Sequence, residues 1–450
     1  MVVLVNALVG AFRNEVLELL KQLVSYPTVN DPSKNLKPSK DIVEFMVDWF
    51  KGYGIDVNVL ESNGYYSVYG LLGSKPCVML LAHFDVVPVA LERWHYDPFN
   101  LTVVDDKAYG RGALDDKSNV AAIMIAVREL SKESLDCGVA FAFTGDEEIG
   151  GANGAGVMAK KLESEGLIPK YLINGDGMGM NVIVRRRKAF NVTISVPALK
   201  SRVRGFVKKV KFTAYYPTSQ HAHAAYFIPG VDSHPLLTAS VFVREGSHYV
   251  RQVRGTFLKS NVIPSEVELE YVTPDPQGED VEVDLNLTEL LKSLMSVSRT
   301  PLAVRGYSDF GVTATPNMYS LSGNNHVVTF DVRAMAYVED VEKAFNDVVM
   351  NTLRNAEVKV RSDPGGYMNT PLTSKLVTTF LDVLREAGFD GRVGEGAGAS
   401  DSRYFTLLGV ESIDFGPRGG GMHGDDEFVD IPSLTVLPEL YVKAVKKLVK

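Results

Sequence analysis

The stretch Val78-Met79-Leu80-Leu81-Ala82-His83-Phe84-Asp85 joins an unbroken apolar run to two polar residues. Such a run is typical of a strand that is covered on both faces of a sheet, as in parallel α/β sheets. His83 and Asp85 then lie at the carboxyl end of the strand, where open α/β sheets bind their ligands. The stretch therefore predicts an α/β fold with a functional site at one edge of its sheet.

Two later segments repeat this order of an apolar strand followed by an acidic residue. Residues 139–144 precede Glu147 and Glu148, and residues 171–174 precede Asp176. Before and between these strands, apolar residues recur at helical spacing, in the segments 11–24, 39–53, 120–130 and 153–166. Strands that alternate with helices in this way indicate a parallel α/β sheet.

The pattern changes near residue 189, where alternating segments indicate an antiparallel sheet. These segments are residues 189–200, 206–215, 256–272 and 326–334, with helical patterns at 288–297 and 338–355. The α/β pattern returns after residue 363, with a helix at 373–387, a strand at 410–414 and a helix at 432–450. We therefore expect a catalytic domain in two parts, residues 1–188 and 364–450, and an inserted α+β domain of residues 189–363.

The composition of the 450-residue chain is that of a globular protein of two or three domains. Its net charge of −8 gives no basis for binding nucleic acid or an anionic membrane. The basic run at residues 185–188 is interpreted as a solvated strand end or a substrate-facing rim. No apolar run approaches the length of about 18 residues that spans a membrane. Cys77 and Cys137 each lie in or near an apolar run, so we expect buried free thiols and a cytoplasmic location.

His83 and Asp85 are two residues apart, so on an extended strand their side chains point the same way. Asp85 can then accept the N–H of the imidazole nitrogen that does not bind a metal. Asp115 follows a glycine-bearing turn, and its carboxylate can bridge two cations with one oxygen each. The alternatives are a surface loop for His83 and Asp85 and a helix cap for Asp115.

The adjacent Glu147 and Glu148 diverge at a strand end, so one can bind a metal while the other holds a water. We assign Glu148 to the metal and Glu147 to the water; the alternative is an exposed acidic loop. Asp176 and His423 complete a set of two imidazoles and three carboxylates, which suits a pair of zinc or cobalt ions. With Glu147 left for proton transfer, the set predicts a two-metal hydrolase.

With these residues in place, the chain resembles over nearly its whole length the family of co-catalytic zinc peptidases and deacylases. That family includes glutamate carboxypeptidase, bacterial dipeptidases, carnosinase, aminoacylase, acetylornithine deacetylase and succinyl-diaminopimelate desuccinylase. The motifs that carry the resemblance are residues 81–88, 110–117, 144–151 and 421–424 with Glu427. The resemblance implies a zinc-exopeptidase-like mixed sheet flanked by helices, and an inserted domain that serves as lid and dimerisation domain. A homodimer is therefore expected.

The resemblance also implies a role for each site residue. His83 and Asp176 bind one metal, Glu148 and His423 bind the other, and Asp115 bridges them. Glu147 is the general base and acid, and Asp85 orients His83. Zinc is the expected metal, with cobalt or manganese as alternatives. An aspartate at position 176 favours the peptidase branches of the family.

Two features depart from the family pattern. The lid histidine that polarises the scissile carbonyl has two candidates, of which we favour His223 over His221. The lid also looks enlarged, because the segment 261–264 resembles a family strand motif whose Asp-x-Arg partner comes only at residues 331–333. Arg333 or Arg403 is predicted to bind the substrate carboxylate in bidentate fashion; for each arginine, a structural salt bridge is the alternative.

We therefore expect metal-dependent hydrolysis of an amide bond next to a free carboxylate, in a small peptide or an N-acyl amino acid. A dipeptidase or carboxypeptidase remains open beside a biosynthetic deacylase such as succinyl-diaminopimelate desuccinylase or acetylornithine deacetylase. Other two-metal aminopeptidases are disfavoured because they do not account for both the insertion and the His423 loop. A catalytically silent metal-binding scaffold is the non-enzyme alternative, and the intact Glu147 argues against it.

Overall fold

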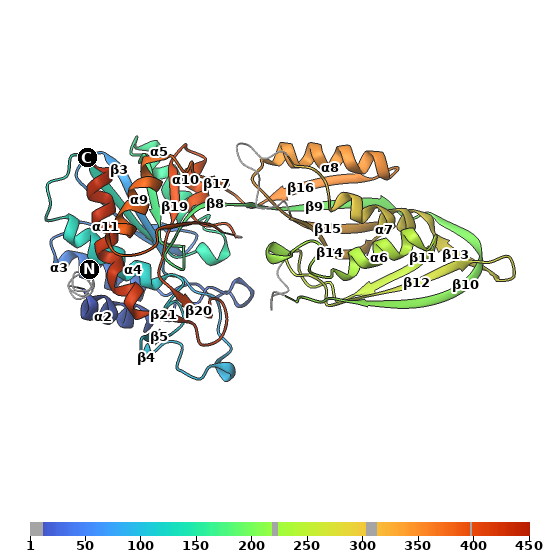
Figure 1. The fold of residues 1–450 in the computed structure, drawn as a ribbon, viewed down its shortest axis with the longest axis horizontal. Coiled ribbons are helices and arrows are strands. Elements are labelled where there is room, and N and C mark those ends of the chain that lie inside the picture. Colours follow the sequence, from blue (N-terminus) through green and yellow to red (C-terminus); the bar gives the residue numbers. More distant parts are fainter. Residues whose placement is uncertain (1–11, 218–223, 303–312, 397) are drawn as a thin grey trace. The chain divides into compact units, whose positions relative to one another are not determined.

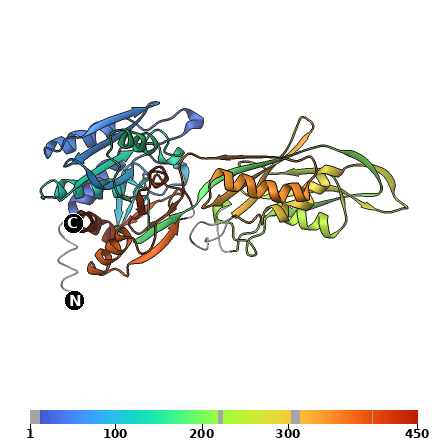
Figure 2. The ribbon, with the colours of Figure 1, turned by 90° about the horizontal axis from the view of Figure 1, so that it is seen from above.

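The computed structural model describes residues 12–217, 224–302, 313–396 and 398–450. The chain divides into two compact units, one formed by Met1–Arg186 with Pro364–Lys450 and the other by Arg187–Asp363. The first unit therefore comes from both ends of the chain, and the second is inserted between them. Figures 1 and 2 show the ribbon of each unit from two directions at right angles.

A nine-stranded mixed sheet forms the centre of the first unit, in the order β1-β2-β6-β3-β7-β19-β8-β17, with β18 paired to β8. Strands β6, β3, β7 and β19 run parallel to one another, whereas β1 and β2 pair antiparallel at one edge. The bounds are β1 (Asn58–Ser62), β2 (Tyr65–Leu72), β3 (Pro76–His83), β6 (Gly138–Thr144), β7 (Tyr171–Asn174), β8 (Asn181–Arg186), β17 (Met368–Asn369), β18 (Arg392–Gly396) and β19 (Glu411–Asp414).

Helices cover both faces of this sheet. The larger apolar core holds α2 (Arg13–Val24), α3 (Asp41–Gly52), α4 (Lys117–Leu130), α9 (Lys375–Glu386) and α11 (Ile431–Leu448). A second core holds α5 (Ala155–Ser164) and α10 (Ser402–Thr406). Alternate residues of β3 divide between the two cores, because successive side chains of a strand point to opposite faces: Val78, Leu80 and Ala82 join the first, and Met79 and Leu81 the second. The predicted α/β fold with a mixed sheet is confirmed.

A small antiparallel sheet connects the two parts of the first unit, in the order β20-β21-β5-β4. Its strands are β4 (Thr102–Val104), β5 (Lys107–Tyr109), β20 (Gly419–Gly420) and β21 (Phe428–Asp430). The pairing of β5 with β21 brings the turn before Asp115 beside the loop that carries His423. Asp430 then caps α11, since its carboxylate accepts the N–H of Ser433 at 2.9 Å.

The inserted unit contains two antiparallel sheets with the same strand order. One is β14-β15-β9-β16 and the other β11-β12-β10-β13, so in each the chain's first strand lies between its third and fourth. Helices α6, α7 and α8 share one apolar core with both sheets. The bounds are β9 (Lys188–Pro197), β10 (Lys200–Thr213), α6 (Pro235–Glu245), β11 (Tyr249–Gly255), β12 (Glu266–Pro274), β13 (Glu279–Asp284), α7 (Leu285–Val297), β14 (Thr313–Ser322), β15 (Asn325–Ala334), α8 (Val338–Thr352) and β16 (Glu357–Ser362).

One expectation for the inserted unit was wrong in detail, and one strand was not predicted. The alternating segment 256–272 is not one strand, because residues 256–265 separate β11 from β12 and Pro264 lacks the N–H that a ladder needs. The polar segment 273–286 contains the edge strand β13, whose residues at positions 281 and 283 are buried while their neighbours at 280 and 282 are exposed. Acidic residues on the exposed side of an edge strand hide its alternation from a composition-based prediction.

The expectation of two free thiols was also wrong, because Cys77 and Cys137 form a disulfide with their Cα atoms 6.0 Å apart. The two cysteines stand at the amino ends of β3 and β6, which pair in parallel with Pro76 opposite Gly138. Sequence spacing separates them by 60 residues, so only the order of the strands reveals the pairing. The cysteines therefore give no support for a reducing compartment. Among the described residues, no helix is long and apolar enough to cross a membrane.

Candidate active site

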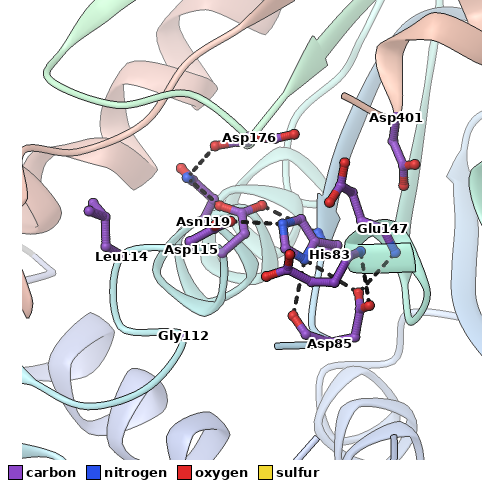
Figure 3. Close-up of polar contacts among 12 residues, drawn as sticks. His83, Asp85, Gly112, Leu114, Asp115, Asn119, Glu147, Asp176 and Asp401 are labelled. Carbon is purple, nitrogen blue, oxygen red and sulfur yellow. Dashed lines mark hydrogen bonds and ion pairs between the residues drawn. The ribbon is translucent and has the colours of Figure 1, made fainter. Parts of the chain in front are cut away.

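The parallel strands of the first unit bring predicted site residues to one edge of the sheet. β3 ends at His83, β6 is followed by the 3-10 turn η3 (Glu147–Ile149), and β7 ends two residues before Asp176. Because β3 pairs in parallel with both β6 and β7, the carboxyl ends of the three strands are neighbours. Figure 3 shows the side chains of His83, Asp115, Glu147 and Asp176 gathered at this edge.

Asp115 stands between two imidazole rings. Its Oδ1 lies 2.9 Å from Nε2 of His83, and its Oδ2 lies 3.0 Å from Nε2 of His423. The same nitrogen of His423 is 3.1 Å from Oε2 of Glu148. Asp115, Glu148 and His423 each offer one ligand atom, and these three atoms all lie within 4.8 Å of one another. A carboxylate that presents one oxygen to each side has the geometry required of a bridging ligand.

Asp85 connects the imidazole of His83 to the turn that carries the two glutamates. Nδ1 of His83 lies 3.1 Å from the carbonyl oxygen of Asp85 and 3.4 Å from its Oδ1. The carboxylate of Asp85 also accepts the backbone N–H groups of Glu147 and Glu148, each at 3.1 Å. Nδ2 of Asn30 donates to the same carboxylate at 2.9 Å. Asp85 therefore fixes the ring and the turn together, which is more than its sequence position suggested.

Asp176 is held by Arg186, a cation to which the sequence analysis gave no partner. Arg186, in the basic run at the end of β8, donates to the carbonyl oxygen of Asp176 and lies 3.3 Å from its Oδ1. The same guanidinium pairs with Asp414, and the neighbouring Arg185 pairs with Glu395 at 2.6 Å. The interpretation of the run as a solvated strand end is wrong for these arginines, because acidic partners from distant segments compensate their burial.

Several carboxylates lie close together in a buried space, and this shifts the pKa values of the site residues. Burial raises the pKa of Glu148 to about 8, with the charge of Asp115 adding to the effect. Burial likewise raises the pKa of Glu147 and of Asp176. Burial opposes protonation of His423, but hydrogen bonds to Asp115 and Glu148 outweigh it and raise its pKa to about 11. Such a cluster favours bound cations, which compensate the carboxylate charges that burial penalises.

The donor set fits divalent metal ions. Imidazole nitrogens and carboxylate oxygens are the ligands that zinc and related ions accept. Among the described residues, Oε1 of Glu148 is buried without a hydrogen-bond partner, which leaves that oxygen available to a cation. The arrangement can therefore hold metal between His83, Asp115, Glu148 and His423.

Glu427 is a buried site residue to which the sequence analysis gave no role, although it stood in a matched motif. Its carboxylate accepts backbone N–H groups from Gly112, Leu114 and Asp115 at 3.1, 2.8 and 2.9 Å. Arg111 donates to it at 2.5 Å and also donates to the carbonyl oxygen of Gly424 at 2.7 Å. Glu427 thus joins the turn that presents Asp115 to the loop that presents His423.

Asp401 lies beside Glu147 (Figure 3). Asp401 is buried and accepts a hydrogen bond from Oγ1 of Thr144 at 2.9 Å. Burial raises its pKa well above the usual range, and the charge of Glu147 raises it further. Arg403 is also buried, and it donates to the carbonyl oxygen of Gly150, just beyond η3. The sequence analysis singled out Arg403 but missed Asp401.

The predicted substrate-site residues in the inserted segment are Arg333, His221 and His223. Arg333 forms a bidentate pair with Asp331 on the same strand, through Nε and Nη2 at 2.8 Å each. That pair matches the structural alternative given for this arginine. His221 and His223 lie outside the described residues.

Comparisons with known proteins show what the whole chain is similar to. The sequence model of one family, described as peptidase family M20/M25/M40, matches residues 79–447. The chain is 23% identical over 448 residues to a succinyl-diaminopimelate desuccinylase of Aliarcobacter butzleri (strain RM4018), covering 96% of this chain and 99% of the relative.

Two solved structures show the same fold. Aminoacylhistidine dipeptidase from Vibrio alginolyticus aligns with a TM-score of 0.72 at 16% identity, covering 96% of each chain. The YXEP protein of Bacillus subtilis, described as a dinuclear metal-binding peptidase, aligns with a TM-score of 0.54 at 13% identity and 98% coverage of each chain.

Proposed function

The chain belongs to peptidase family M20/M25/M40, and from this membership we propose that it hydrolyses its substrate with two metal ions and with Glu147 as the general base. Membership by itself makes the protein a metal-dependent hydrolase that acts on amide bonds. The number of metal ions, the role of each residue and the substrate are the proposal. The observation that carries it is the carboxylate of Asp115, placed within 3.0 Å of one imidazole on each side.

We assign one metal to His83 and Asp176 and the other to Glu148 and His423, with Asp115 shared between them. Zinc is the metal that this mixed donor set favours, with cobalt or manganese as alternatives. Such ions, when bound, would polarise the substrate carbonyl and lower the pKa of a bound water to about 7. The dinuclear description of the YXEP protein supports two metals rather than one.

Glu147 is suited to move the proton. Burial raises its pKa, so its carboxylate is a stronger base than an exposed glutamate. Asp85 holds the backbone of Glu147 and the ring of His83 in one network, which fixes the base beside the metal ligands. Glu147 takes a proton from the attacking water and then delivers it to the leaving amine.

The proposed substrate is an amide next to a free carboxylate, in a dipeptide or in an N-acyl amino acid. The similarity to the aminoacylhistidine dipeptidase of Vibrio supports the first, and the similarity to the succinyl-diaminopimelate desuccinylase of Aliarcobacter supports the second. Arg403 is the preferred anchor for the carboxylate, because it lies in the same unit as the metal ligands, whereas Arg333 lies in the inserted unit.

We further propose that the inserted unit is a lid and dimerisation domain, and that His223 rather than His221 polarises the scissile carbonyl. The family resemblance supports both assignments. Light scattering on the purified full chain tests the homodimer: a mass of twice 49.3 kDa is expected, and a monomer at all concentrations rules it out.

The function is tested with initial rates of the zinc- or cobalt-loaded protein on three substrate sets: dipeptides, dipeptides with an amidated carboxyl end, and N-succinyl or N-acetyl amino acids. Cleavage of free dipeptides that is lost on amidation supports the peptidase, and a preference for N-acyl amino acids supports the deacylase. Two bound metals without any cleavage would favour a silent scaffold. Arg403→Gln should raise KM for free-carboxylate substrates more than for amidated ones. The same measurement on Arg333→Gln compares the other candidate anchor.

A further inference from the structure

A buried asparagine lies where three segments of the metal site meet. Asn119 is fully buried in the first turn of α4, and Figure 3 shows it beside Asp115 and Asp176. Its side chain is not among the donors assigned to a metal. The hydrogen bonds of this neutral amide define its role among the carboxylates.

The amide nitrogen of Asn119 joins two segments that carry metal ligands. Nδ2 donates to Oδ1 of Asp116 at 2.7 Å and to the carbonyl oxygen of Gly175 at 2.6 Å. Asp116 follows the bridging candidate Asp115, and Gly175 precedes Asp176. The second carboxylate oxygen of Asp116 accepts the backbone N–H of His83 at 3.3 Å, so the third ligand segment is tied to the same group.

The amide oxygen of Asn119 is fixed from the far end of the chain. The hydroxyl of Tyr441, on α11, lies 2.6 Å from Oδ1 of Asn119 and 3.2 Å from the carbonyl oxygen of Phe415. Tyr441 is fully buried, so this hydroxyl donates out of contact with bulk solvent. The phenol therefore defines which atom of the amide is the oxygen and turns both N–H groups toward Asp116 and Gly175.

Close packing makes this arrangement specific to the residues present. A Cβ atom added at Gly175 would lie 2.5 Å from Cβ of Asn119, so the turn before Asp176 can approach α4 only because position 175 is glycine. A carboxylate at position 119 would have the same shape as the amide but no N–H to donate. It would also place a second acidic group against Asp116.

We infer that Asn119, oriented by Tyr441, is a positioning residue that sets the spacing between the metal ligands Asp115, Asp176 and His83. This inference rests on the proposed metal site. It assigns the amide no contact with substrate or metal; the amide acts through Asp116 and Gly175. Residues that orient ligands in this way typically change metal affinity by 10–100-fold when they are replaced.

The test is a metal titration of the full-length Asn119→Asp variant. The metal-free protein is titrated with Co²⁺, and affinity is measured by competition with a chromophoric chelator while the cobalt absorption spectrum reports coordination. Asn119→Asp is expected to weaken at least one site by about 10–100-fold and to alter the spectrum. Tyr441→Phe, which removes only the hydroxyl, is expected to give a smaller loss of affinity in the same site, and it keeps the test decisive if Asn119→Asp does not fold.

Asn317 supplies a matched control in the inserted unit. It is also fully buried, and its amide donates to the carbonyl oxygen of Ser260 at 2.5 Å and to Thr315 at 3.1 Å, while its oxygen lies 3.0 Å from Nε2 of His234. Asn317→Asp therefore removes the same kind of donor from a site without proposed metal ligands. Its cobalt affinity and spectrum are expected to equal those of the wild type.

Two results would overturn the inference. One is a folded Asn119→Asp or Tyr441→Phe variant with wild-type cobalt affinity and spectrum. The other is an equal loss of affinity in Asn317→Asp, which would show a general effect of destabilisation. Failure of the proposed metal site is distinguishable, because the wild type itself would then bind fewer than two cobalt ions. Failure of the proposed activity is also distinguishable, because it would leave cobalt binding by the wild type intact and appear only as missing turnover.

Discussion

The carboxylate of Glu427 accepts the backbone N–H of Asp115 at 2.9 Å, across 312 residues of the sequence. The same carboxylate accepts two more backbone N–H groups from this turn, those of Gly112 and Leu114, and it forms an ion pair with Arg111. Glu427 and Arg111 are both buried. The position of Asp115, the proposed bridging ligand, therefore depends on a residue in the loop that also carries His423.

Replacing Glu427 by glutamine should destabilise the protein. The change leaves the buried guanidinium of Arg111 without its counter-charge, and loss of one partner of a buried pair costs about 3–5 kcal/mol. Urea unfolding of the metal-free protein measures the difference. Glu279→Gln, on the exposed side of β13, is the control and should change little. A cost for Glu427→Gln below about 1 kcal/mol would contradict a stabilising role of the Glu427–Arg111 pair.

Replacing Glu147 by alanine should abolish turnover while the metals stay bound. A general base contributes about 10²–10⁴-fold to the rate, and Glu147 is not one of the assigned ligands. Turnover and metal content are measured on the same preparation. Glu148→Ala, which removes an assigned ligand, should lose metal as well as activity. A Glu147→Ala variant with near-normal turnover would show that the base is another group.

The stability of the inserted unit should fall in mild acid because of His234. Burial lowers the pKa of this histidine to about 4, below its ordinary value near 6.5. Between these two values the unfolded chain binds a proton that the folded protein does not. Above pH 6.5, the titration of His234 therefore leaves the free energy of unfolding unchanged. Below that pH, it lowers the free energy of unfolding by about 1.4 kcal/mol for each pH unit, down to about pH 4.

The pH effect is measured as the difference in unfolding free energy between wild type and His234→Gln, from pH 7 to pH 4.5. The subtraction removes the titration of groups that both proteins share. The wild type should lose stability relative to the variant as the pH falls. A difference that stays constant over this range would mean that the buried imidazole keeps an ordinary pKa.

The disulfide should stabilise the fold without taking part in the chemistry. Cys77 and Cys137 close a loop of 60 residues, and a cross-link of that span contributes about 4 kcal/mol by constraining the unfolded chain. Cys137→Ser should lower the free energy of unfolding by about that amount. Turnover at 25 °C should be unchanged, since the cysteines stand at the opposite ends of β3 and β6 from His83 and Glu147. Equal stability in both proteins would contradict the cross-link.

The sequence alone was enough for the features that depend on local pattern. The buried run before His83 predicted a central strand, and β3 is that strand. The strands before Glu147 and Asp176 followed from the same reasoning and are β6 and β7. These predictions succeed because hydrophobic periodicity is a property of a few neighbouring residues, and because the carboxyl ends of parallel strands meet at one edge.

The tertiary structure alone decided which distant residues are partners. Arg186 lies in a basic run that the sequence interprets as a solvated strand end or a substrate-facing rim, yet β8 and β19 place it against Asp176 and Asp414. The disulfide depends on β3 and β6 being neighbours, and the contact of Asn119 with Tyr441 depends on α11 packing against α4. Strand order and helix packing arise from the whole core, so no local pattern in the chain encodes these pairs.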